Sequence, residues 1–149
     1  MAGPSLRERA IRCLARREHS RAELALKLKS HGSAEEIEEV LERMTELGLL
    51  SDHRMAEAWV RTKAARFGVA RLRHDLARHG IGRETIDAVL ESQCGQSELD
   101  RARAVRLTKF DSRPENAKEW AKQARFLQNR GFAADIIRTL LNEEGDESA

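Results

Sequence analysis

Apolar residues recur at intervals of three and four along most of the chain, in stretches separated by serines and glycines. No stretch alternates apolar and polar residues in the company of β-branched side chains, so the pattern predicts helices and no strands. We expect nine helices, near residues 6–17, 21–31, 34–47, 52–67, 69–79, 83–94, 98–110, 113–130 and 134–144.

Residues that typically cap helices recur at the expected helix ends. A serine followed three residues later by an acid can form a capping box, which opens a helix. The five matches are Ser5/Glu8, Ser20/Glu23, Ser33/Glu36, Ser97/Asp100 and Ser112/Glu115, the last with Pro114 in its first turn. Glycines that could close helices in the left-handed conformation are Gly32, Gly48, Gly68, Gly80, Gly95, Gly131 and Gly145.

The nine helices fall into threes because the chain repeats itself. The segments LKSHGSAEEIEEVL (28–41), LARHGIGRETIDAVL (76–90) and LQNRGFAADIIRTLL (127–141) share a leucine, a glycine four residues later and then an apolar stripe. Such a period predicts an all-α tandem array of three-helix repeats, elongated and curved. The expected divisions are a disordered N-terminus (1–5), repeats at 6–51, 52–95 and 96–142, and an acidic disordered tail (143–149).

The composition indicates the cellular compartment of the protein but says little about its function. Apolar residues make up 40% of the chain and charged residues 35%, with a net charge of only +2. Cys13 and Cys94 are interpreted as free thiols of a reducing compartment. Neither a signal peptide nor an apolar run of about 20 residues is present, so we expect a cytoplasmic protein without a membrane span.

The charge is unevenly distributed. From Arg54 to Arg83 the chain holds eight Lys or Arg and only two acids, Glu57 and Asp75, whereas the segment 34–47 is rich in glutamate. A basic stripe is often ordinary solvated surface, and that interpretation stays open beside one in which the stripe binds phosphate or an acidic protein groove. The candidate binding residues are Arg54, Arg61, Lys63, Arg66, Arg71, Arg73, His74 and Arg78.

Two details shape what this stripe could bind. On a helical wheel Lys63 falls in the apolar sector, where it either extends its head to water or lies at the rim of a groove. The chain has only two Trp and four Phe, and of these Trp59, Phe67, Trp120 and Phe126 are expected in the core, which does not favour stacking on bases. Any contact with DNA should therefore be electrostatic and weakly selective for sequence.

The stretches GLLSDHRMAEAWVR and GVARLRHDLARHGI resemble the signature of the RecX family of recombination regulators, and the resemblance extends over about residues 6–141. The matching positions are Gly48, Leu50, Asp52, Arg54, Ala56, Gly68, Arg71, Leu72, Leu76, Gly80 and Ile81. The chain departs from the pattern at Met55, where Phe is common, at Leu49, where an aromatic residue is frequent, and in having no tyrosine.

The resemblance implies a cytoplasmic, non-enzymatic protein that needs no cofactor. It implies binding in the groove of the RecA–DNA filament and inhibition of the ATPase, strand-exchange and coprotease activities of RecA. Some members also bind DNA, here expected to be weak and not selective for sequence. We expect a monomer that bridges successive RecA subunits, and so either locks them in one state or blocks addition at the filament end.

Two other classes of protein are less well supported. An enzyme is disfavoured because the chain has no P-loop, no Gly-rich dinucleotide turn and no HExxH. The one histidine pair near ligand spacing, His74 and His79, is five residues apart and about 140° around a helix, so we expect neither a catalytic nor a metal site. The alternative is a helix-turn-helix transcriptional regulator, which the segment at 20–50 resembles. Its recognition helix would be acidic, and a helix follows where a wing would need a β-hairpin.

Overall fold

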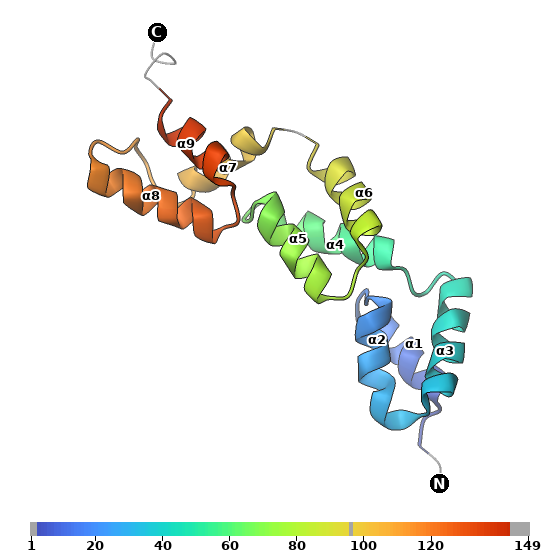
Figure 1. Ribbon diagram of the computed structural model, residues 1–149. Helices are drawn as coiled ribbons and strands as arrows, with labels where there is room; N and C mark the ends of the chain where they lie inside the picture. The colour runs from blue at the N-terminus through green and yellow to red at the C-terminus, as the bar shows by residue number, and fades with distance from the viewer. Residues whose placement is uncertain (1–2, 96, 144–149) are drawn as a thin grey trace. The chain divides into compact units, whose positions relative to one another are not determined.

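The computed structural model describes residues 3–95 and 97–143, and these residues form α-helices with one 3₁₀ turn and no strand (Figure 1). The all-α fold predicted from periodicity is confirmed. The elements are α1 (Leu6–Arg16), α2 (Arg21–Leu28), η1 (Lys29–His31), α3 (Ala34–Glu46), α4 (Asp52–Lys63), α5 (Val69–Arg78), α6 (Arg83–Gln93), α7 (Glu98–Leu107), α8 (Ala117–Asn129) and α9 (Ala134–Leu141).

Several helices are shorter than predicted. Residues 64–67 form a turn after α4 rather than its last turn, and α7 ends three residues before the predicted position at 110. An error of the same size as that in α4, four residues, concerns α8, which begins at Ala117 and not at 113. Its N-cap is Asn116, whose side-chain oxygen accepts the N–H of Glu119 at 2.9 Å. Ser112 and Pro114 therefore precede the helix.

The capping serines of the first repeat behave as predicted. Ser20 with Glu23 and Ser33 with Glu36 form complete capping boxes, in which each side chain bonds the other residue's backbone N–H. Ser5 and Ser97 cap α1 and α7 from one side only. A further cap could not be predicted from the pattern because it lacks the acidic partner: Ser51 Oγ accepts the N–H of Arg54 in the first turn of α4.

Only some of the predicted glycine stops use the left-handed conformation. Positive φ is found at Gly48 (76°), Gly80 (79°) and Gly131 (93°), where other residues would be strained. Gly32 has an extended φ of −171°, and neither Gly68 nor Gly95 has a positive φ, so that prediction was wrong for these three. Gly145 lies outside the described residues, as do the chain ends 1–2 and 144–149.

The helices α1, α2 and α3 pack on one another around a small core, seen at the blue end of the chain in Figure 1. The three apolar stripes meet there because the spacing of their leucines puts them on one side of each helix. The fully buried residues of this core are Ala10, Leu24, Leu28, Ile37, Leu41, Met44 and Leu50.

The helices α7, α8 and α9 form a second three-helix group around a core of their own. Its buried residues are Ala102, Val105, Leu127, Phe132, Ile137, Leu140 and Leu141. The leucines and isoleucines that define the sequence repeat are buried in all three copies: Leu28, Leu76 and Leu127, and Ile37, Ile86 and Ile137. The repeat therefore marks equivalent core positions.

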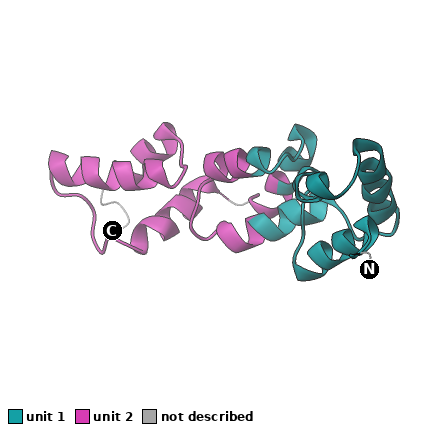
Figure 2. Ribbon diagram, turned by 90° about the horizontal axis from the view of Figure 1, so that it is seen from below, with its two compact units in different colours: residues 1–59, 76–89 teal, residues 60–75, 90–149 magenta. Residues whose placement is uncertain are grey.

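The chain folds into two compact units, whose boundaries differ from those of the three sequence repeats. Residues 1–59 with 76–89 make one unit and residues 60–75 with 90–149 make the other (Figure 2). We call them unit 1 and unit 2. The helices α4, α5 and α6 each contribute residues to both units, so the middle repeat shares its packing with the flanking ones instead of standing alone.

Candidate functional site

The eight basic residues singled out in the sequence lie on α4, on α5 and in the turn between them. Arg54, Arg61 and Lys63 belong to α4, Arg66 to the turn, and Arg71, Arg73, His74 and Arg78 to α5. Arg54 and Arg78 are part of unit 1, whereas the other six are part of unit 2. The structure thus assigns most of the predicted site to one compact unit.

Within unit 2, three guanidinium groups gather around the ring of Phe67. Arg71 lies over the ring with its guanidinium carbon 4.5 Å from the centroid, and Arg66 and Arg130 each lie at 5.5 Å. At these distances the negative face of the ring attracts each cation, an effect of about 0.5–1 kcal/mol at exposed sites. We call Phe67 and these three arginines the Phe67 cluster.

Close backbone packing brings Arg130 to this place. The N–H of Gly68, just before α5, donates to the carbonyl of Arg130, just after α8, at 2.7 Å. A Cβ on Gly131 would lie 2.3 Å from Cβ of Arg71, and one on Gly68 would lie 2.5 Å from the carbonyl oxygen of Gly131. Two glycines therefore let the turn after α8 approach α5 closely enough for the arginines to share one ring.

A buried ion pair fixes the turn that carries Phe67. Arg101 on α7 is only 6% exposed; it pairs with Glu98 and donates to the carbonyls of Ala64 (2.8 Å) and Phe67 (2.6 Å). Glu98 in turn accepts the N–H of Val69 at 2.9 Å. The pair satisfies backbone groups at the end of α4 and at the start of α5, where helices leave such groups unbonded.

The Phe67 cluster extends toward a second ring. Arg130 also lies over Phe126, at 5.0 Å, and the ammonium of Lys109 lies 5.1 Å from the same centroid and 5.8 Å from that of Phe110. Phe110 and Phe126 meet edge to face at 5.4 Å. Three aromatic residues of unit 2, Phe67, Phe110 and Phe126, thus have cations close to their rings. The sequence disfavoured stacking on bases because these rings were expected in the core, but Phe67 and Phe126 are only partly buried. Stacking on them is disfavoured for another reason, because cations lie over their faces.

The acids close to this surface are few. Asp75 pairs with Arg71 through Nε at 3.2 Å, one turn along α5. The side chains of Arg61, Arg66 and His74 are exposed and form no ion pair with any described residue. Lys63 and Arg73 are partly buried and already engage other groups of the protein. The surface therefore retains a local excess of positive charge that could hold phosphate or carboxylate groups.

Arg54 has a different environment, in unit 1. Its Nε donates to Glu18 at 2.5 Å, and this hydrogen bond raises the pKa of the guanidinium above its ordinary value. Arg78, also in unit 1, is exposed and forms no ion pair with a described residue. Of these two predicted residues, only Arg78 has a charge that is not already balanced inside the protein.

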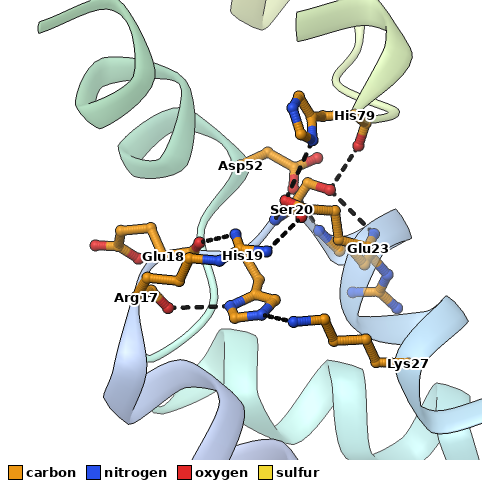
Figure 3. A network of polar contacts seen from close by, with 9 residues as sticks. Arg17, Glu18, His19, Ser20, Glu23, Lys27, Asp52 and His79 are labelled. Carbon is orange, nitrogen blue, oxygen red and sulfur yellow. Dashed lines mark hydrogen bonds and ion pairs between the residues drawn. The ribbon is translucent and has the colours of Figure 1, made fainter. Parts of the chain in front are cut away.

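Unit 1 contains a polar network that the sequence did not suggest (Figure 3). Ser20 Oγ donates to the carbonyl of His79 at 2.5 Å, and Asp52 accepts the N–H of Arg21 at 2.7 Å. Residues of α2 and its cap thereby bond the start of α4 and the end of α5. Serine and aspartate near helix starts gave a local signal, but each partner lies far away in the sequence.

His19 precedes Ser20 in the chain and is 1% exposed. Its Nδ1 lies 3.0 Å from the carbonyl of Arg17, and its Nε2 lies 2.9 Å from Nζ of Lys27. The Nδ1–H tautomer suits both contacts, because Nε2 then accepts a hydrogen bond from the ammonium. Burial holds the pKa of His19 below its ordinary value of 6.5, and the nearby Arg17 and Lys27 act in the same direction.

Other kinds of site receive no support from the described residues. They contain no group of three or more His, Cys, Asp or Glu placed to hold a metal ion. No helix formed by residues 3–95 and 97–143 is both long enough and apolar enough to span a membrane.

Three consecutive ranges of the chain match the three-helix domains of a known protein family. Residues 7–44 match the first three-helix domain of RecX, residues 51–90 the second and residues 96–141 the third. We call these ranges the first, second and third domains. Three tandem three-helix domains thus account for nearly the whole chain.

Relatives named regulatory protein RecX cover almost the full length. One from Leptothrix cholodnii is 44% identical over 92% of this chain and 87% of its own, and one from Pseudomonas fluorescens is 42% identical over 95% and 92%. One from Neisseria gonorrhoeae is 43% identical over 97% of this chain and 94% of its own.

Solved structures agree on the fold. A crystal structure of a regulatory protein RecX covers 93% of this chain and 72% of its own with a TM-score of 0.78 at 23% identity. That of RecX from Lactobacillus salivarius covers 91% and 92% with the same TM-score at 21% identity. The chain matches all three domains in their order and resembles its relatives along almost the full length, so it belongs to the RecX family.

Proposed function

We propose that the chain regulates the RecA recombinase by binding the RecA–DNA filament and lowering its ATPase, strand-exchange and coprotease activities. Membership of the RecX family supports the partner. The observation that supports the mode of binding is the Phe67 cluster, where three arginines share one ring and, among the described residues, only Asp75 forms an ion pair with one of them.

The chemistry of this surface suits a partner with many negative charges. A guanidinium offers parallel N–H donors that match a carboxylate or a phosphate, and an arginine already placed on a ring loses little side-chain freedom when it binds. In the proposed complex, the partners of these donors are acidic side chains of RecA or phosphates of the DNA. Arg61, Arg66, Arg71 and His74 would meet those groups, with Arg78 on the same helix as the last two.

Inhibition would follow from occupation and not from chemistry. A chain that contacts successive RecA subunits prevents the relative movements that accompany ATP hydrolysis, or prevents a subunit from joining the filament end. Differential affinity for one filament state is all that such regulation requires. Direct DNA binding through the same surface would be electrostatic, so it should weaken steeply with salt.

The helix-turn-helix alternative loses its main structural requirement. Residues 52–63 form α4, and no strand is present in the described part of the chain, so the β-hairpin of a wing is missing there. The helix in the recognition position, α3, exposes Glu35, Glu38, Glu39 and Glu42, and such a face would repel phosphate.

Titration of the purified chain into RecA bound to single-stranded DNA tests the proposal. ATP turnover should fall to a plateau as the chain saturates the filament, and strand exchange should fall over the same concentration range. The chain titrated against the DNA alone, at low and at moderate salt, measures how much of the effect comes from competition for DNA. Turnover that stays constant while the chain demonstrably binds the filament would contradict the proposed inhibition.

A further inference from the structure

The first domain carries a second cationic surface, outside the stripe predicted from sequence. A cleft of about 630 Å³ opens between α1 and α2 with η1. Five basic residues line it, and no acid is found among its described lining residues. The basic residues are Arg9, Arg12 and Arg16 on α1, Lys27 on α2 and His31 in η1.

The arginines form a row because of their spacing. Residues 9, 12 and 16 are three and four positions apart, so they follow one face of α1, rising about 4.5 and 6 Å from one to the next. In the described part of the chain none of the three forms an ion pair or a side-chain hydrogen bond. Their charge is therefore available to a ligand.

On the opposite wall of the cleft, a hydrogen bond to a buried histidine holds Lys27 in place. The ammonium of Lys27 donates to Nε2 of His19, which is buried in the polar network of unit 1 (Figure 3). One of its three donors is used there, and the other two remain for a ligand. His19 is thus a positioning residue for Lys27.

We propose that this cleft binds the phosphodiester backbone of a nucleic-acid strand. A row of guanidiniums along one wall and an ammonium on the other suits a linear chain of regularly spaced negative charges, and each guanidinium fork matches a phosphate. No aromatic residue lines the cleft, so bases would not stack in it and sequence would not be read.

An acidic peptide is the other ligand with suitable charge, and the lining disfavours it. Protein partners are usually anchored by large apolar or aromatic side chains inserted in apolar pockets. Here the uncharged lining consists of Cys13, Ala15 and the buried Leu28. None of these residues is aromatic, and the only large one is buried, so they form no apolar pocket for such an anchor, whereas a sugar-phosphate backbone needs none.

Cys13 offers a reporter inside the cleft. It is a free, partly buried thiol among the lining residues. In a Cys94→Ser variant it is the only cysteine of the chain, so its rate of alkylation reports on the cleft alone. We expect a short single-stranded oligonucleotide of mixed sequence to slow alkylation several-fold at low salt, and added salt to restore the rate.

Affinity measurements on variants complete the test. Arg9→Glu, Arg12→Glu and Arg16→Glu together should weaken oligonucleotide binding by about tenfold or more at low salt. They should also reduce the slope of the logarithm of affinity against the logarithm of salt concentration by about 2, because each phosphate that is no longer neutralised removes about 0.7 from it. Arg7→Glu, Arg125→Glu and Arg138→Glu together are the matched control of equal charge change, because these arginines are exposed and do not line the cleft.

The two readouts decide the proposal. Protection of Cys13 together with a reduced salt slope for the triple variant supports it. An unchanged alkylation rate in the presence of saturating oligonucleotide overturns it, as does protection by a polyglutamate peptide without protection by the oligonucleotide. Because Cys13 reports only on this cleft, failure here would leave the inhibition of RecA ATPase unaffected and separately measurable.

Discussion

Two buried arginines in the third domain show that the surroundings of a charge decide whether it stabilises the fold. Arg101 is 6% exposed and has Glu98 and two backbone carbonyls as partners. Arg106 is 9% exposed, and its Nε has no hydrogen-bond partner within the described residues. Burial lowers the pKa of Arg106, with Arg113 and Arg103 contributing in the same direction.

Replacing each arginine by methionine should therefore have opposite effects. Arg101→Met should lower the free energy of unfolding by about 3 kcal/mol, because it leaves one carboxylate oxygen of Glu98 and two carbonyls without their donor. Arg106→Met should raise it by about 1 kcal/mol, since a poorly compensated buried charge is replaced by an apolar side chain of similar length. Urea denaturation followed by circular dichroism measures both. A loss of stability in both variants would contradict the assignment of Arg106 as a poorly compensated buried charge.

His19 gives a pH dependence with a defined sign. Its folded-state pKa is lowered below 6.5, chiefly by burial, so the folded protein binds this proton less readily than the unfolded chain. The stability that the neutral ring provides is fully present above pH 6.5 and is lost as the pH falls through the folded pKa. The loss should be at most about 1.4 kcal/mol for each pH unit.

The comparison with His19→Gln isolates this contribution. Glutamine can still donate to the carbonyl of Arg17 and accept from Lys27, but it does not titrate. Thermal unfolding at a series of pH values below 7 should therefore show a weaker acid destabilisation in the variant. Identical pH profiles for the two proteins would mean that His19 keeps an ordinary pKa in the folded state.

At the scale of single elements, the sequence predicted the helices well because their signals are local. Periodicity and the capping serines at residues 20 and 33 are complete within a few residues, and the structure forms both boxes. The start of α8 was predicted wrongly because Asn116–Glu119 repeats, four residues later, the pattern of Ser112–Glu115. The carbonyl of Ser112 accepts instead from the buried side chain of Gln123.

Substitutions at the two competing caps test this assignment. Asn116→Ala should lower the free energy of unfolding by about 1 kcal/mol, because it removes the acceptor of an N–H in the first turn of α8. Ser112→Ala should change it by less than about 0.5 kcal/mol, since only the backbone of Ser112 is used. Denaturant unfolding of the two variants separates the possibilities. A larger loss for Ser112→Ala would place the start of the helix at 113 after all.

The sites were less predictable than the helices, for a physical reason. Counting charges between 54 and 83 found Arg66 and Arg71, but Arg130 joins them only through tertiary packing at Gly68 and Gly131. Nor could the count show that Arg54 is paired with Glu18, far from it in the sequence. The spacing of Arg9, Arg12 and Arg16 places them on one face of a helix in the sequence alone. Whether acidic residues lie close to them, however, depends on the fold.

At the scale of the whole molecule, a net charge of +2 conceals strong local differences. The second domain carries an excess of cations, whereas the exposed face of α3 in the first domain is acidic. Association with a polyanion depends on the local field and not on the total, and this field is screened by salt. The proposed regulation of RecA therefore depends on where the charges lie.

The most direct measurement compares two triple variants of equal charge change in the inhibition of RecA ATPase on single-stranded DNA. The first carries Arg61→Glu, Arg66→Glu and Arg78→Glu, whose side chains are exposed and form no ion pair with described residues. The second carries Arg7→Glu, Arg125→Glu and Arg138→Glu, which are exposed elsewhere on the chain. Both should keep the helical circular dichroism of the unmodified protein.

We expect the first variant to need at least about tenfold more protein for half-maximal inhibition, because three favourable contacts become repulsive, whereas the second should inhibit nearly as well as the unmodified protein. Equal inhibition by both variants and by the unmodified chain would contradict the account. It would show that the cationic surface of α4 and α5 is ordinary solvated surface and that RecA is regulated through another part of the chain.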